Sequence, residues 1–199
     1  MSGIITVIVG VPMLIIGVIS YRRWYERNGE LVKVWQAVAQ AHHLRFAGKR
    51  PRWSRRLQGS VSGLPITIVG QKPGFGSEWV EISVVVQPHS DHRLQVLASS
   101  SALLRRLLPG DDLPSSGDTA LDQQFIVRSV PENLGAALLR QNSDLRSWLL
   151  HATIRYRQVS LGLRNSLLTY RQRGTIESED DLRQLISLLT QFALHIARG

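Results

Sequence analysis

Residues 57–69 read Leu-Gln-Gly-Ser-Val-Ser-Gly-Leu-Pro-Ile-Thr-Ile-Val, and this stretch decides the fold of the chain. Its two runs, 57–61 and 64–69, flank the dipeptide Ser62-Gly63, which suits the tight turn of a β-hairpin. Residues 79–87 then alternate valine and isoleucine with polar side chains, as a half-buried strand does. The sequence therefore predicts a mainly antiparallel sheet.

Helices are predicted before and after these strands. Residues 30–43 place Leu31, Trp35 and Val38 at helical spacing, so one face of this helix should pack on the sheet. At the other end of the chain, Ser178 can cap a helix that carries an apolar stripe from Leu182 to Ile196. Between them the pattern predicts strands over 94–98, 121–129, 153–160 and 167–173, and helices over 132–141, with Pro131 at its first position, and 143–150.

The N-terminus differs in composition from the rest of the chain. Residues 3–20 carry no charge, and Tyr21-Arg22-Arg23-Trp24-Tyr25-Glu26-Arg27 follows directly. A helix of eighteen residues is roughly 27 Å long, close to the hydrocarbon thickness of a bilayer. Basic residues flank only its C-terminal end, and the positive-inside rule then places the N-terminus outside. We therefore expect a single-pass protein of the inner (plasma) membrane with its domain in the cytoplasm.

The expected fold class is α+β, with a single N-terminal transmembrane helix followed by one cytoplasmic domain, whose mainly antiparallel sheet is packed by helices. Residues 1–21 would be the transmembrane anchor and 22–29 a basic and aromatic juxtamembrane segment. Residues 30–199 would form one soluble domain, which is long enough to bury its own core.

Three glycines in the apolar run are spaced by seven residues. Gly3, Gly10 and Gly17 would lie on one face of a helix, where small residues let a second transmembrane helix approach closely. This spacing favours a helix-packing site for a transmembrane protein partner. The alternative is that glycine is simply common in membrane helices.

The formal net charge of +9 is concentrated near the N-terminus. Residues 21–60 hold ten lysines and arginines against two glutamates, whereas the rest of the chain is almost neutral. This favours contact with an anionic membrane surface, although Trp53 among arginines is also compatible with stacking on a nucleic acid base or with a solvated loop. We weight anionic lipid or an acidic protein surface above nucleic acid. The predicted membrane-surface residues are Arg22, Arg23, Trp24, Arg27, Arg50, Arg52, Trp53, Arg55 and Arg56.

Residues with catalytic potential are few. His89 and His92 flank Asp91 at a spacing that could ligate a metal, but this motif is more typical of a turn. Asp118 and Asp122 could form an acid–base pair, yet Gly117-Asp118 is typical of a turn and Asp122 is expected to open a strand. The chain has no cysteine and no phosphate-binding or metalloprotease motif. The sequence predicts a protein that is not an enzyme and that uses no cofactor or metal.

The order of these elements resembles a broad group of uncharacterised bacterial membrane-anchored proteins. They share a domain of unknown function with a Leu-x-Gly-x-Val-x-Gly hairpin and a Gly-Asp-x-x-Leu/Phe-Asp-x-x-Phe-x-Val segment. The resemblance covers roughly residues 30–197, and it implies an anchor and a domain boundary but no activity. The matching residues are Leu57, Gly59, Val61, Gly63, Gly117, Asp118, Leu121, Asp122, Phe125, Val127, Leu138 and Leu139.

Two functions from different classes fit these observations. The first is a non-catalytic accessory or scaffold subunit of a larger membrane protein assembly, anchored by one helix with its domain on the cytoplasmic face. The second is a membrane-surface module that binds anionic lipid or an apolar ligand. Protein partners that copurify in fixed ratio would favour the first, and bound lipid would favour the second.

Overall fold

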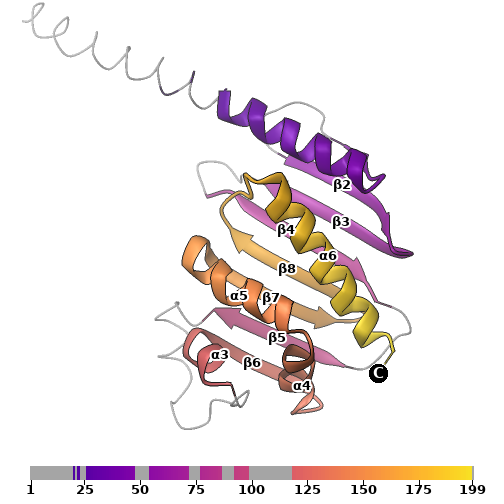
Figure 1. Ribbon diagram of the computed structural model, residues 1–199, viewed down its shortest axis with the longest axis vertical. Coiled ribbons are helices and arrows are strands. Elements are labelled where there is room, and N and C mark those ends of the chain that lie inside the picture. The colour runs from indigo at the N-terminus through magenta and orange to yellow at the C-terminus, as the bar shows by residue number, and fades with distance from the viewer. Residues whose placement is uncertain are drawn as a thin grey trace, which may run out of the picture.

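The computed structural model describes residues 20, 22, 26–47, 54–71, 77–86, 92–98 and 118–198. A sheet of eight strands forms one layer, and helices form the other (Figure 1). We refer to the helical residues 26–41, drawn in indigo, as the first helix. The strands are β1 (Arg45–Phe46), β2 (Ser54–Val61), β3 (Leu64–Gln71), β4 (Trp79–Val85), β5 (Arg93–Ala98), β6 (Phe125–Val130), β7 (Arg157–Arg164) and β8 (Leu167–Arg173). The later helices are α3 (Thr119–Gln124), α4 (Leu134–Gln141), α5 (Ser143–Arg155) and α6 (Glu179–Ile196).

Every strand pair in the sheet is antiparallel, and the strand order is β1-β2-β3-β4-β8-β7-β5-β6. The N-terminal strands β1 to β4 therefore form one half. The pairing of β4 with β8 joins this half to the other, with Ser83 opposite Thr169. Strands that are far apart in sequence thus lie side by side in the middle of the molecule.

Two tight hairpins fix the register of the sheet. At the first, Ser62 and Gly63 both have positive φ, 52° and 82°, as a type I′ turn requires. The predicted hairpin is therefore present, with Val61 opposite Leu64. The second hairpin turns at Asn165 and Ser166, whose φ values are 51° and 60°. It joins β7 to β8. Strand β7 extends to Arg164, further toward the turn than the predicted end at residue 160, whereas β8 has the predicted bounds 167–173.

The core lies between the sheet and the helices. Ser178 caps α6 by accepting a hydrogen bond from the backbone N–H of Asp181 at 3.2 Å, as predicted. The apolar stripe of α6 is buried, and Phe192 and Leu189 have no exposed surface. The first helix packs Trp35 against Gly70 of β3, where an added Cβ would come within 3.0 Å of the indole ring. Glycine at position 70 thus allows the close approach of helix and strand.

Three predicted boundaries between helix and strand are wrong. Residues 121–129 do not form one strand, because α3 occupies the first part and β6 begins at Phe125. Asp122 consequently lies on a helix. Pro131 follows a cis peptide bond, and α4 begins only at Leu134. Helix α5 continues through Thr153 to Arg155, so that β7 starts later than predicted.

The predicted fold class is contradicted in its membrane-spanning helix. Among the residues that the structure describes, no helix is both long enough and apolar enough to cross a bilayer. Of the apolar run 3–20, only Ser20 is among the described residues. The expected location, a single-pass inner-membrane protein with an outside N-terminus and a cytoplasmic domain, depended on that helix and is contradicted with it.

Candidate functional site

The residues predicted to contact a membrane or a second helix are only partly described. Gly3, Gly10 and Gly17 lie outside the described residues, as do Arg23, Trp24, Arg50, Arg52 and Trp53. Of the others, Arg22 pairs with Glu26 at 2.9 Å and Arg27 pairs with Glu177, so both belong to ion pairs on the helix-covered side.

Arg55 and Arg56 point to opposite faces of β2. Arg55 shares the face of buried Leu57, and its guanidinium donates a hydrogen bond to Oδ1 of Asn28 in the first helix at 2.5 Å. Burial lowers the pKa of Arg55, and the nearby charge of Glu78 opposes this shift. Arg56 is exposed on the other face. Arg55 is thus a packing residue, and of this pair only Arg56 is available to a partner.

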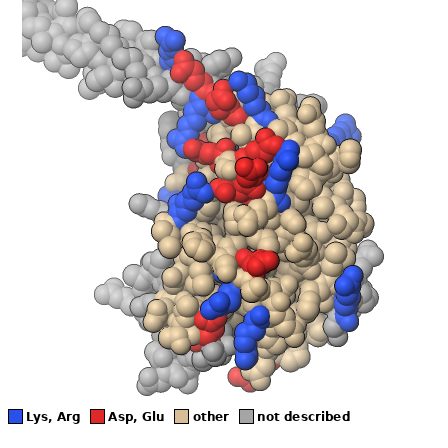
Figure 2. All heavy atoms as spheres, in the orientation of Figure 1, with Lys and Arg blue, Asp and Glu red and all other residues tan. Residues whose placement is uncertain are grey.

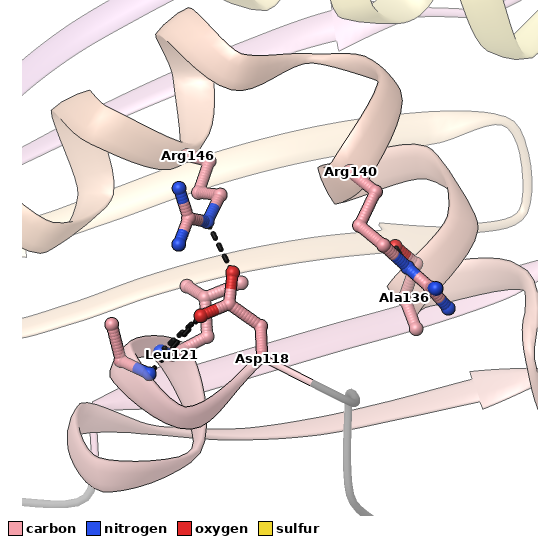
Figure 3. A network of polar contacts seen from close by, with 6 residues as sticks. Asp118, Leu121, Ala136, Arg140 and Arg146 are labelled. Carbon is pink, nitrogen blue, oxygen red and sulfur yellow. Dashed lines mark hydrogen bonds and ion pairs between the residues drawn. The ribbon is translucent and has the colours of Figure 1, made fainter.

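Asp118 is held in a structural role. Its carboxylate accepts hydrogen bonds from the backbone N–H groups of Ala120 at 3.0 Å and Leu121 at 3.3 Å, which caps α3 (Figure 3). Nε of Arg146, from α5, donates to the second carboxylate oxygen. The Arg146 hydrogen bond is the main cause of a pKa below the ordinary range for Asp118. A carboxylate that remains charged in this way is unsuited to donate a proton at neutral pH.

The histidines considered for metal binding give no cluster that the structure describes. His89 and Asp91 lie outside the described residues, and no group of three histidine or carboxylate side chains suited to a metal occurs among those described. His42 is half-buried at the end of the first helix, and burial is the main cause of its lowered pKa. Burial therefore favours the neutral form of this histidine.

A different surface stands out, on the far side of the sheet from the helices. Along each strand, one set of alternate side chains packs under the helices, and the other set points away from them. We call the second set the open sheet face. Its side chains are exposed or half-buried, except for Ile126 on the edge strand β6, which is 6% exposed.

Arginines lie around the margin of the open sheet face. They lie on the outer strands and toward the ends of the central strands, and all are exposed except Arg173, which is half-buried. The described residues of this face include one acidic residue, Glu81 on β4. The arginines are Arg45, Arg56, Arg93, Arg128, Arg164, Arg171 and Arg173.

The centre of the open sheet face is neutral and built from small side chains. Strand register places Thr67, Ser83, Thr169 and Gly162 in one row across β3, β4, β8 and β7. Beside this row, Leu167 is 41% exposed at the turn of the second hairpin.

One aromatic residue lies on the open sheet face among the described residues. The guanidinium of Arg171 lies 4.4 Å from the ring centroid of Trp79, and it also approaches a carboxylate oxygen of Glu81 at 3.9 Å. Arg171 on β8 thus contacts both the ring of Trp79 and the carboxylate of Glu81, because these two residues lie on the neighbouring strand β4.

The helix-covered side of the molecule has a different charge balance. Apart from the open sheet face and Arg157, whose side chain is not described, the described residues include nine basic and eleven acidic ones. Most of these basic residues form ion pairs, such as Arg155 with Asp181 at 2.5 Å. Figure 2 views this side and shows acidic and basic side chains next to one another. The excess positive charge of the described residues therefore lies on the open sheet face.

Sequence reasoning missed most of these arginines. Counting charge along the chain assigned the excess to residues 21–60 and left the remainder almost neutral. That remainder contains acidic residues that lie on the helical side, whereas Arg128, Arg164 and Arg171 lie on the open sheet face. The alternation of arginine with buried valine and leucine along single strands was the available signal. This alternation reveals the excess of positive charge only when charges are counted separately for the two faces of the sheet.

The described fold is thus an eight-stranded antiparallel sheet covered by helices on one side. No family model matches the chain, and no curated protein matches it either. The resemblance to uncharacterised membrane-anchored proteins therefore remains a prediction. Among solved structures, the chain is similar to the mycobacterial trehalose monomycolate transport factor A, with a TM-score of 0.50 and 11% sequence identity. The similarity covers 82% of this chain and 92% of that one, and at this identity it concerns the fold alone.

Proposed function

We propose that the protein is a non-catalytic accessory subunit that binds another protein through its open sheet face. The observation that carries the proposal is the anatomy of this face, where arginines surround a neutral centre and Trp79 lies at the end of β4 beside Arg171. Protein interfaces have a charged, solvent-accessible rim around a less charged core, and they are enriched in arginine and aromatic residues. The open sheet face has the same arrangement.

The size of the face is sufficient for a stable complex. The eight strands contain 52 residues. With strands about 4.8 Å apart and about 3.3 Å per residue, they cover roughly 800 Å². A typical stable interface buries about 800 Å² on each partner. The whole face, rather than a part of it, would therefore be needed for binding.

The hydrogen bonds of Asp118, a candidate catalytic residue, support a role without catalysis. Asp118 is engaged by two backbone N–H groups and by Arg146, which leaves it to hold α3 and α5 together. The protein of similar structure is a transport factor, which is compatible with a role without catalysis.

The proposal can be tested by site-specific crosslinking in the cells that naturally contain the protein. A photo-crosslinking phenylalanine analogue would replace Leu167 on the open sheet face. The matched control would replace Gln184, which is exposed on α6 on the opposite side of the molecule. We expect a discrete adduct from position 167 and none of the same mass from position 184. Mass spectrometry would identify the partner, and the complex would then be rebuilt from purified proteins.

Two outcomes would contradict the proposal. Equal adducts from both positions would mean that the open sheet face has no special role in binding. An adduct that consists only of two copies of this chain would indicate self-association instead of an accessory role.

A further inference from the structure

We infer that the partner presents an acidic surface, whose carboxylates pair with the arginines around the open sheet face. This inference rests on the proposed function and adds the chemistry of the partner. Seven arginines and one glutamate give the face a strong positive charge. Within the described residues, Arg171 alone of the seven has an ion-pair partner, Glu81. The other guanidinium groups therefore keep their capacity for an external anion.

The type of cation is compatible with carboxylates on a protein. All seven basic residues of the face are arginine, and the one lysine described, Lys33, lies on the first helix, paired with Glu30 at 2.9 Å. Arginine presents a planar fork that binds a carboxylate with two parallel hydrogen bonds. It is enriched at protein interfaces, whereas lysine is depleted there.

The geometry of the face disfavours two other anionic partners. Single-stranded nucleic acids bind to sheets by stacking bases on exposed aromatic rings. Trp79 is the one aromatic residue on the described face, and the guanidinium of Arg171 lies over its ring. A flat lipid surface fits poorly as well, because neighbouring strands of a sheet are rotated by about 20° and eight strands form a twisted surface. The outer arginines on β1 and β6 cannot then contact one plane together.

The neutral centre separates the arginines in space. Arg56 on β2 and Arg164 on β7 are separated by β3, β4 and β8, so they lie about 19 Å apart across the sheet at the usual strand spacing. A single anion cannot bridge that distance. The partner must therefore carry several carboxylates around a region that fits the small side chains of Thr67, Ser83 and Thr169.

The test compares charge reversal on the two sides of the full-length protein. The sheet-face variant is Arg56→Glu/Arg164→Glu, and the control is Arg140→Glu/Arg198→Glu on α4 and after α6. All four residues are exposed, and both variants change the net charge equally. The probe is a labelled polyglutamate peptide, and thermal unfolding would confirm that both variants are folded. We expect polyglutamate binding to be about tenfold weaker for the sheet-face variant, with little change for the control.

The same proteins would be tested with phosphatidylserine vesicles and with a thymidine oligonucleotide. Tighter binding of either probe than of polyglutamate, lost in the sheet-face variant, would overturn the inference in favour of lipid or nucleic acid. Equal weakening of polyglutamate binding in both variants would also overturn it, because total charge would then explain the binding. If the adduct at position 167 persists in any of these cases, the protein-binding function stands and only the acidic character of the partner is wrong.

Discussion

At the scale of single residues, Asp118 shows how one side chain can determine local structure. Its carboxylate caps a helix of six residues and also receives a hydrogen bond from Arg146, 28 positions later. Short helices are marginal in isolation, since their stability comes largely from tertiary contacts. The pairing of Asp118 with Arg146 therefore explains why residues 121–124, which were predicted to belong to a strand, are helical.

Replacement of Asp118 should separate its two roles. Asp118→Ala removes the cap and the ion pair, whereas Asp118→Asn keeps an oxygen that can cap α3. We expect both variants to be less stable than the wild type at pH 7, with the alanine variant about 1 kcal/mol below the asparagine variant. Urea unfolding measures the difference. Equal stability of the two variants would show that the cap contributes nothing.

The stability gap between wild type and Asp118→Asn should depend on pH. The pKa of Asp118 is lower in the folded than in the unfolded state, so its contribution is complete above the unfolded value of about 3.9. This contribution is lost as the pH falls through the lower, folded value. Urea unfolding from pH 7 to pH 3 should therefore show the gap closing toward the acid end. A constant gap would contradict the ionic role of Asp118.

At the scale of elements, glycine determines how closely helix α4 approaches the sheet. A Cβ at Gly135 would lie 2.7 Å from Cδ1 of Leu94 and 3.0 Å from Cγ1 of Val127, both on strands under the helix. Gly29, in the first helix, has no atom within 4 Å of the same position. The two sites are therefore a matched pair, one crowded and one open.

Gly135→Ala should destabilise the protein by about 1–3 kcal/mol, because overpacking outweighs the better helix propensity of alanine. Gly29→Ala should instead stabilise it by up to about 1 kcal/mol, since only the propensity changes there. Thermal and urea unfolding of both variants would test this. If Gly135→Ala were as stable as Gly29→Ala, α4 would not be packed as closely as the structure indicates.

The elements that the sequence predicted best are those with local signals. Ser62-Gly63 forces a turn, and Ser178 caps α6, so both are apparent from a few neighbouring residues. The errors arose where a contact between residues far apart in the sequence determines the local structure. Thr153 is β-branched and suggested a strand, yet it continues α5 and donates a hydrogen bond to Gln124 at the end of α3. Such a contact joins residues 29 positions apart, and no local pattern contains it.

At the scale of the whole molecule, the open sheet face could not be predicted because it depends on strand order. Arg171 and Glu81 are neighbours only because β8 pairs with β4, ninety residues earlier in the chain. Alternation within a strand indicates which residues share a face, but it does not indicate which strands lie next to one another. The candidate binding surface therefore became visible only with the full topology.

The same topology places α6 over the junction between the two halves of the sheet. This helix packs on β4 and β8, where the N-terminal half meets the C-terminal half. Leu189 lies fully buried in its apolar stripe. Loss of contacts here should therefore weaken both halves, although they are built from separate parts of the sequence.

Leu189→Ala should lower the free energy of unfolding by roughly 3 kcal/mol, through lost burial and the cavity that remains. Because α6 bridges the sheet, we expect native-state hydrogen exchange to show the same loss of protection for slowly exchanging amides in β3 and in β7. Gln184→Ala, on the exposed side of the same helix, is the control and should change neither strand. A loss confined to β7 would mean that the hairpin β2–β3 unfolds independently, so that the two halves of the sheet would not form one cooperative unit.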